Sequence, residues 1–207
     1  MVSEQIWLVD DEEDIREAVG FLLGTAGYSV RTFAGPSELL AEVTPAHRGC
    51  LLLDVRLPEM DGLELQTRLR EAGVNMPILF ISGHGDIPMA VRAVNAGALD
   101  FLEKPFDDET LLERVARALE LDREQAEHVA AIGDIERRLG NLTPREREVM
   151  EHMLEGKLNK IIAADLGMSV RTVEVHRARV LEKLGVRNSS EMVRKVLSTE
   201  TYRDWLV

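Results

Sequence analysis

Polar side chains follow four short apolar runs in the first half of this sequence. In chain order they are Asp10 and Asp11, Asp54, Ser82 and Lys104. A buried strand seldom ends on a charge that has no use, and parallel strands end at one edge of a sheet, where ligands bind. We therefore expect these side chains to lie close together.

A site of this composition has a specific chemistry. Several carboxylates at one sheet edge repel one another, and a hard divalent cation relieves that repulsion. Oxygen donors without Cys or His favour Mg²⁺. A lysine and a hydroxyl could hold the oxygens of a phosphoryl group, whose in-line transfer needs little beyond positioning and charge neutralisation. Asp54, at the centre of the group, is the predicted nucleophile.

The elements that would position these residues alternate between strand and helix patterns. Apolar runs predict strands at residues 6–9, 28–30, 50–54, 77–81 and 99–103. Helical spacing predicts helices that begin at Asp14 (as the capping residue), Pro36, Leu63, Ile87 and near Asp108. This alternation is typical of an α/β fold, a doubly wound, five-stranded parallel sheet of the flavodoxin-like kind.

The last of these helices carries an apolar stripe beyond the predicted sheet. The stripe occupies positions 112, 115, 119, 126, 129 and 132. It predicts a helical linker over residues 123–139, although Gly133 interrupts the pattern. The linker either self-associates along this stripe or is a solvated helix.

Residues 140–207 have the pattern of a small all-α domain. Thr143 and Glu146 form a capping box around Pro144, which predicts a helix start. Ser169 is placed to cap a later helix. Further helices are expected at 161–166, 170–184 and 191–197. A short helix, a glycine-containing turn and a longer helix form the helix-turn-helix arrangement.

Charge is distributed unevenly along the chain. The net charge of −12 comprises −13 on residues 1–122, −1 on residues 123–139 and +2 on residues 140–207. The segment 157–187 alone carries +4. A basic segment inside an acidic protein points to nucleic acid as a partner of the second half.

The same composition bears on the cellular compartment. The single cysteine, Cys50, lies within an apolar run and is interpreted as a buried thiol of a reducing compartment. The sequence contains no run of 18 apolar residues and no signal peptide. We therefore expect a cytoplasmic protein that has no membrane partner.

Residues 4–122 resemble the receiver domain of two-component response regulators, because the acidic pair, the central aspartate, the hydroxyl and the Lys104–Pro105 pair match that family in order and spacing. The resemblance implies that Asp54 accepts phosphate from a sensor histidine kinase. It implies Mg²⁺ ligands at Asp10, Asp11, Asp54 and the carbonyl of Arg56. Ser82 and Lys104 would contact the phosphoryl group, and Phe101 would be the switch aromatic residue. No enzymatic activity is implied beyond the domain's own phosphorylation and dephosphorylation.

Residues 83–91 and 100–106 look like the FixJ branch of this family, in which the fourth helix and fifth strand form a phosphorylation-dependent dimer surface. Val91, Val94 and Leu99 belong either to that surface or to the core. Arg56 and His84 each follow a site residue by two positions, and we hypothesise that they tune the access of water; they could equally be plain surface residues.

Residues 140–197 resemble the LuxR-type helix-turn-helix, because the segments 142–149, 159–163, 171–177 and 183–184 match it in order. Val173, Val180 and Leu184 are expected in the core. The resemblance places three residues of the recognition helix at base edges: Glu174, Val175 and Ala178. The expected phosphate contacts are Lys160, Thr172, Arg177, Arg179 and Lys183. His176 is interpreted as a half-buried packing residue that also touches a phosphate, and not as a metal ligand.

The sequence as a whole therefore predicts a phosphorylation-dependent transcription regulator of the NarL/FixJ type. Its expected domains are a receiver (1–122), a helical linker (123–139) and a DNA-binding domain (140–207). Phosphorylation would promote a homodimer that binds promoter DNA, with RNA polymerase as a further partner. An intact recognition helix argues against an interaction switch without DNA output, and the complete Asp/Ser/Lys set argues against a receiver that works unphosphorylated.

Overall fold

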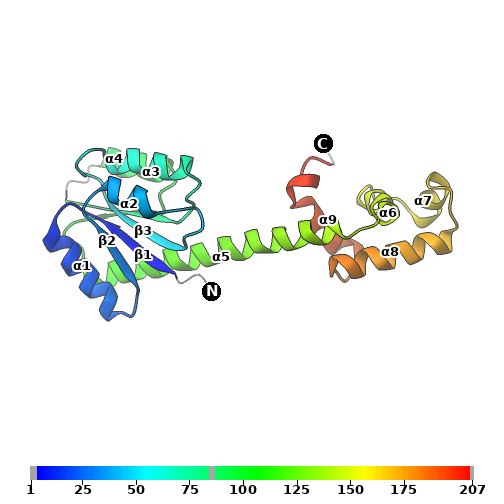
Figure 1. The fold of residues 1–207 in the computed structure, drawn as a ribbon, viewed down its shortest axis with the longest axis horizontal. Helices are drawn as coiled ribbons and strands as arrows, with labels where there is room; N and C mark the ends of the chain where they lie inside the picture. Colours follow the sequence, from blue (N-terminus) through cyan, green and yellow to red (C-terminus); the bar gives the residue numbers. More distant parts are fainter. Residues whose placement is uncertain (1–3, 84–86, 206–207) are drawn as a thin grey trace. The chain divides into compact units, whose positions relative to one another are not determined.

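The computed structural model describes residues 4–83 and 87–205 of the chain. The chain forms two compact units, residues 1–125 and 126–207 (Figure 1). The first is a five-stranded parallel sheet with helices, and the second is helical, which confirms the predicted fold class. Among the described residues, no helix combines the length and the apolar character needed to cross a membrane.

The first unit is built on a parallel sheet with the strand order β2-β1-β3-β4-β5. The strands are β1 (Gln5–Val9), β2 (Val30–Phe33), β3 (Gly49–Asp54), β4 (Ile78–Ser82) and β5 (Asp100–Glu103). The helices are α1 (Glu13–Thr25), α2 (Pro36–Glu42), α3 (Gly62–Glu71), α4 (Ile87–Asn95) and the first part of α5 (Asp108–Gly140). This is the doubly wound arrangement that the alternating pattern predicts.

Both faces of the sheet are buried, because successive strand residues point to opposite sides. In β3, Leu51 and Leu53 pack toward α2 and α3, whereas Cys50 and Leu52 pack toward α1 and α5. All six residues of β3 are buried. Asp54 therefore stands at the end of a fully buried strand, and Cys50 is the buried thiol that the sequence indicates.

Two details of the first unit differ from the sequence-based expectation. The strand predicted at 28–30 lies at Val30–Phe33, because the backbone N–H of Tyr28 donates to the carbonyl of Leu23 (3.0 Å) and so belongs to the turn after α1. The predicted capping residue Asp14 lies within the first turn of α1, whose N-cap is Glu12.

Helix α5 runs unbroken for 33 residues, so the last predicted helix does continue through Gly133. Val115 and Leu119 are buried in the core of the first unit, and Ile135 and Leu139 in that of the second. Val129, between these sets, is 68% exposed. Whether the exposed stretch self-associates stays a prediction, as do the domain boundaries at 122 and 139.

The second unit comprises the end of α5 and four further helices: α6 (Pro144–Leu154), α7 (Asn159–Asp165), α8 (Val170–Leu184) and α9 (Ser189–Leu197), followed by the 3₁₀ helix η1 (Glu200–Tyr202). The capping box is present, because Thr143 Oγ1 accepts from the N–H of Glu146 and the Glu146 carboxylate accepts from the N–H of Thr143. Helices α7 and α9 each begin two residues before their predicted starts.

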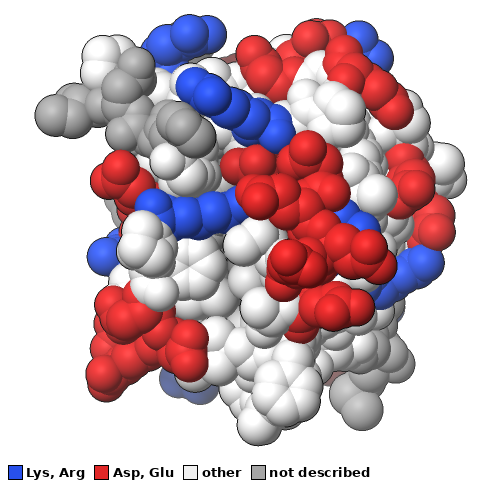
Figure 2. Space-filling model, turned by 90° about the vertical axis from the view of Figure 1, so that its left-hand side faces the viewer, with Lys and Arg blue, Asp and Glu red and all other residues white. Residues whose placement is uncertain are grey.

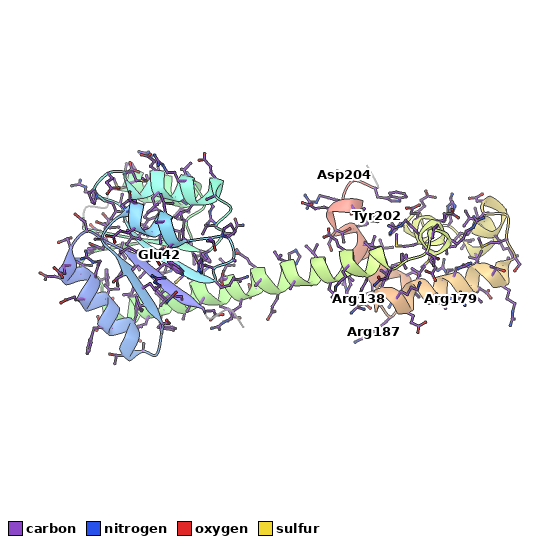
Figure 3. The ribbon with its side chains drawn as sticks, in the orientation of Figure 1. Glu42, Arg138, Arg179, Arg187, Tyr202 and Asp204 are labelled. Atoms are coloured by element: carbon purple, nitrogen blue, oxygen red, sulfur yellow. The ribbon has the colours of Figure 1, made fainter. Side chains whose placement is uncertain are left out.

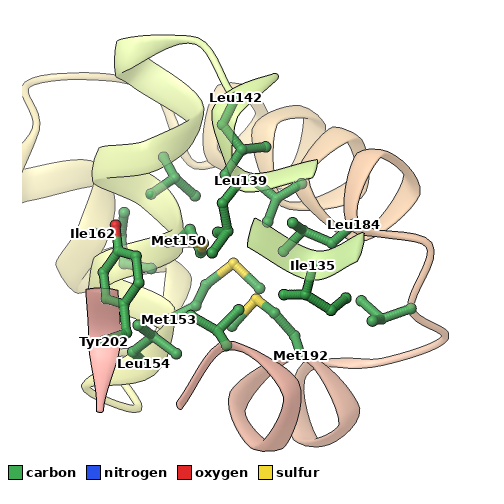
Figure 4. Close-up of a cluster of buried hydrophobic side chains, with 14 of the residues drawn as sticks. Ile135, Leu139, Leu142, Met150, Met153, Leu154, Ile162, Leu184, Met192 and Tyr202 are labelled. Carbon is green, nitrogen blue, oxygen red and sulfur yellow. The ribbon is translucent and has the colours of Figure 1, made fainter. Parts of the chain in front are cut away.

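Methionine and branched aliphatic side chains from α5, α6, α8 and α9 form the core of the second unit (Figure 4). Met150, Met153 and Met192 lie at its centre, with Leu139 and Leu184 beside them. Because Val173, Val180 and Leu184 of α8 are buried at helical spacing, the opposite side of α8 is left exposed, as predicted.

Candidate functional site

The carboxyl edge of the sheet gathers the acidic residues that follow β1 and end β3. One carboxylate oxygen each from Asp10, Asp11 and Asp54 lies within 4.8 Å of the others. Asp10 and Asp54 are buried, whereas Asp11 is exposed. Figure 2 views this side of the molecule and shows Asp and Glu side chains gathered into a patch, with Lys and Arg side chains next to it.

Lys104 and Ser82 lie at the same edge. Lys104 Nζ donates to Asp10 Oδ2 at 2.7 Å, and the backbone N–H of Lys104 donates to the carbonyl of Ser82 at 2.8 Å. Ser82 is buried at the end of β4. The structure therefore brings together all five side chains that the strand ends single out, and Lys104 already faces an acidic member of the group.

Burial raises the pKa of the Asp54 carboxyl above its ordinary value, and the positive charge of Lys104 opposes that rise. Its Oδ1 also accepts the backbone N–H of Val55 at 2.8 Å. The ionised carboxylate is therefore disfavoured at this site unless a cation compensates for lost solvation. The described residues offer three carboxylates here and no sulfur or imidazole donor, a set that suits a hard, oxygen-binding ion such as Mg²⁺.

One contributor to this edge was missed by the sequence analysis. Arg16, in the first turn of α1, donates from Nη1 to the backbone carbonyls of Asp10 (2.7 Å) and Asp11 (2.9 Å). The sequence could have pointed to Arg16, because it is a lone cation that follows five consecutive acidic residues.

The predicted switch elements have mixed surroundings. Phe101 is half-buried and packs against the same core as Phe80. On α4, Val91 and Val94 are 51% and 49% exposed, so they belong to the surface rather than the core. Arg56 is exposed. His84 lies outside the described residues.

In the second unit, α8 presents its predicted reading face to solvent. Glu174, Val175 and Ala178 are exposed, as are the predicted phosphate contacts Thr172 and Arg179. Figure 3 labels Arg179 on this helix. The exposed set matches the requirement that base-reading side chains be free to enter the major groove.

A hollow of about 640 Å³ lies between the start of α7 and α8. It is separate from a hollow of about 690 Å³ in the first unit. Lys160, Glu174 and Arg177, three of the predicted DNA contacts, all line the hollow at α8. Lys157 and Ser189 also line it and were not singled out from the sequence. The Arg177 guanidinium donates to Ser189 Oγ (3.1 Å), which orients it within the hollow.

Two predicted contacts have roles inside the domain. Lys183 Nζ donates to Glu146 Oε2 (2.6 Å) and to the carbonyl of Asn141 (3.1 Å), so a DNA contact by Lys183 would compete with this pair. His176 is half-buried, and its Nδ1 is buried without a hydrogen-bond partner among the described residues. Both observations favour packing or positioning roles for these side chains.

Comparison with known proteins defines the class of both units. A family model for the response regulator receiver domain matches residues 6–116, and a model for bacterial regulatory proteins of the luxR family matches residues 140–196. The chain therefore belongs to the two-component response regulators that carry a LuxR-type DNA-binding domain. It is a transcription regulator and not a typical enzyme.

Individual relatives match nearly the whole chain. The response regulator TmoT of Ectopseudomonas mendocina is 42% identical over 97% of this chain and 90% of its own length. The transcriptional regulatory protein FixJ of Azorhizobium caulinodans is 41% identical over 94% and 92%. Among solved structures, the response regulator StyR has a TM-score of 0.81 at 40% identity, covering 94% of this chain and 98% of StyR.

Proposed function

We propose that Asp54 is the phosphoacceptor of this regulator. A phosphoryl group passes from a histidine of the cognate sensor kinase to a carboxylate oxygen of Asp54, so that a P–N bond breaks and a P–O bond forms. Lys104 and Ser82 contact the transferred oxygens. The observation that carries the proposal is the convergence of Asp10, Asp11 and Asp54 beside Lys104 at the end of buried strands.

The same carboxylates, together with the backbone carbonyl of Arg56, would hold Mg²⁺, with Asp10 acting through a water molecule. When bound, the ion neutralises negative charge that gathers between the carboxylates and a phosphoryl group. Lys104, directly after β5, supplies the complementary positive charge. The buried position of Asp54 limits the access of water to the acyl phosphate.

We further propose that the kinase docks beside α1. A groove of about 690 Å³ there is lined mainly by apolar side chains, with Lys104 at its margin. It is formed by Ile15, Ala18, Val19, Phe21, Leu22, Thr25, Lys104, Pro105, Phe106 and Asp108. Phe21 is 78% exposed and belongs to this lining together with Ile15 and Leu22, and a contiguous exposed apolar patch marks a site where a partner binds.

Phosphorylation is proposed to favour a homodimer through α4 and β5, where Val91 and Val94 are exposed. Two linked DNA-binding units then bind two half-sites of a promoter, which raises affinity without new contacts. RNA polymerase is a proposed partner at such promoters. DNA binding of this kind also supports a cytoplasmic location.

The test is the oligomeric state of the full chain in Mg²⁺, measured by light scattering with and without beryllofluoride, an analogue of the phosphoryl group. We expect the wild-type protein to dimerise on addition of beryllofluoride and Asp54→Asn to remain monomeric. Asp61→Asn is the matched control, because Asp61 caps α3 through its side chain and asparagine caps equally well.

Dimerisation of Asp54→Asn on addition of beryllofluoride would contradict the assignment of Asp54. A wild-type protein that binds beryllofluoride without a change in mass would contradict the dimer while leaving the phosphoacceptor in place. Binding itself is followed by the beryllofluoride-dependent rise in the unfolding temperature, which should be present in wild type and Asp61→Asn and absent in Asp54→Asn.

A further inference from the structure

Arg16, near the start of α1, lies close to the acidic loop that joins β1 to α1. Residues 10–14 are Asp-Asp-Glu-Glu-Asp, and Arg16 follows in the first turn of α1. A helical side chain leans toward the N-terminus of its helix, so Arg16 reaches back over the loop that precedes it. Its nearest acceptors are peptide carbonyls: Nη1 lies 2.7 Å from the oxygen of Asp10 and 2.9 Å from that of Asp11.

We propose that Arg16 is a positioning residue for the metal site. By binding two successive carbonyls it fixes the peptides of Asp10 and Asp11, and so fixes where their carboxylates stand. It leaves the carboxylate oxygens themselves available as ligands, because its N–H groups are directed at backbone oxygens. The inference rests on the proposed Mg²⁺ site and adds a residue to it that is not itself a ligand.

The hydrogen bonds from Arg16 matter more for Asp11 than for Asp10, because Asp10 has other anchors. Asp10 is fixed on several sides: its N–H donates to the carbonyl of Phe33 (3.2 Å), and its carboxylate accepts from Lys104 Nζ (2.7 Å). Asp11 is exposed, and the hydrogen bond from Arg16 ties its peptide to α1. Arg16 thus joins an exposed metal-binding residue to a buried one through a single nitrogen atom.

Two possible roles of Arg16 predict opposite results. If it acted only as a nearby positive charge, it would repel the metal ion, and its removal would tighten Mg²⁺ binding. If it positions the carboxylates, its removal lets them spread apart and weakens binding. Loss of such an outer contact typically lowers metal affinity by about 10- to 100-fold. The direction of the change therefore separates positioning from electrostatics.

The experiment is isothermal titration of the full chain with Mg²⁺ for wild type, Arg16→Met, Arg16→Gln and Arg16→Lys. We expect about tenfold weaker binding in the two neutral variants. Arg16→Lys should recover part of the affinity, because an ammonium group can still donate to a carbonyl. Arg16→Gln serves as a second neutral variant, so the test does not depend on the folding of one protein; thermal unfolding without Mg²⁺ checks each fold.

Arg70→Met is the matched control. The guanidinium of Arg70 also donates to backbone carbonyls, those of Val74 (3.2 Å) and Gly97 (3.5 Å), but it extends from α3. Its loss should leave Mg²⁺ affinity unchanged even if it lowers the unfolding temperature. Equal weakening in Arg70→Met would show that any loosening of the fold disturbs the site, and would overturn the proposal.

The remaining outcomes also decide the question. Unchanged or tighter Mg²⁺ binding in the neutral Arg16 variants, with a wild-type protein that binds the ion, would overturn the positioning role and leave the metal site intact. A wild-type protein that takes up no Mg²⁺ would instead overturn the metal site of the proposed function, and this inference with it.

Discussion

The two functional regions of this regulator arrange their charges in opposite ways. At the sheet edge, Asp10 and Asp54 are at most 5% exposed, and Lys104 is already paired. On α8, Glu174 and Arg179 project into solvent. Because the first set is buried and its lysine is paired with Asp10, the fold imposes one geometry on it. An exposed set acquires its final geometry only against DNA, so the same chain contains one site fixed by packing and one completed by its partner.

The largest effect should come from removing the cation of the buried set. Lys104→Met deprives a fully buried carboxylate, that of Asp10, of its ion pair at 2.7 Å. It also removes the charge expected to face the phosphoryl oxygens. We expect phosphorylation of Asp54 by acetyl phosphate in Mg²⁺ to slow by about 100-fold, the usual loss for one charge-stabilising group. The measurement is incorporation of labelled phosphate.

Lys195→Met is the control for this comparison, because Lys195 pairs with Glu191 at 3.0 Å on the surface of α9. Its loss should leave the phosphorylation rate unchanged. Wild-type rates in Lys104→Met would mean that Lys104 only balances the charge of Asp10 and takes no part in the transfer.

The DNA-binding unit also contains a buried carboxylate, that of Glu146, which can be compared with Asp10 at the sheet edge. Glu146 is 3% exposed and accepts from Lys183 Nζ at 2.6 Å. Its hydrogen bond with Lys183 lowers its pKa to about 2, against the opposing effect of burial. Lys183 is partly exposed, so solvent screening weakens its attraction to Glu146. Glu146→Gln should therefore lower the free energy of unfolding of the second unit by about 2 kcal/mol at neutral pH.

The pH dependence of this effect has a definite sign. A lowered pKa in the fold means that the unfolded chain binds the proton more readily. The stabilisation by Glu146 is therefore complete above its ordinary pKa of 4.5 and is lost as the pH falls toward about 2. Calorimetry over this range should show wild type and Glu146→Gln converging in acid. A constant difference would contradict the ion pair as its cause, and Glu155→Gln, at an exposed pair with Lys157, should show no measurable change.

Much of this arrangement could be predicted from the sequence, because its signals are local. Apolar runs and stopping glycines mark the strands and helices, and the ends of parallel strands must share an edge. The second strand was misplaced because it lies at the sheet margin and has two exposed residues, which weakens its apolar pattern. The sequence analysis also predicted the wrong N-cap for α1. The N–H of Glu12, the true N-cap, donates to Asp10 Oδ1 (3.0 Å), and this contact with a site residue has no signal in the sequence.

The parts of the sites that could not be predicted are those made by backbone atoms or by distant partners. Arg16 binds carbonyl oxygens, which every residue possesses, so no residue type marks its acceptors. Lys183 meets Glu146 across 37 positions of the sequence, and its spacing on α8 suits a DNA contact equally well. Residue types indicate which groups can react, whereas their partners depend on how the helices pack.

On the exposed face, Arg177→Ala should weaken binding to all DNA sequences by about tenfold and reduce the slope of log affinity against log salt by about one, because one phosphate contact is lost. Glu174→Ala should instead relax the preference at one base position, since glutamate accepts from a cytosine amino group. Both are measured by fluorescence anisotropy at several salt concentrations. If Arg177→Ala alters only the preferred sequence, the assignment of roles on α8 is reversed.

The smallest effect should come from a buried contact that links the carboxyl-terminal tail to α6. The hydroxyl of Tyr202, a 3% exposed residue, accepts from Arg147 Nη1 (3.0 Å) and donates to Glu151 Oε1 (3.1 Å). Arg147 in turn donates to the carbonyl of Leu139 at the end of α5 (2.7 Å). Tyr202→Phe keeps the ring and removes the hydroxyl, so it should cost about 1 kcal/mol of unfolding free energy.

Chemical denaturation of the full chain checks this value, with Tyr28→Phe in the first unit as the control at a half-buried tyrosine. A loss confined to the transition of the second unit would show that the tail stabilises the DNA-binding unit through a buried polar contact, comparable to the Lys104–Asp10 pair at the sheet edge. An unchanged stability would instead mean that Arg147 keeps its bond to Leu139 without help from the tail. The ring of Tyr202 would then act through apolar packing alone, as it does beside Met153 and Leu154 in the core of that unit (Figure 4).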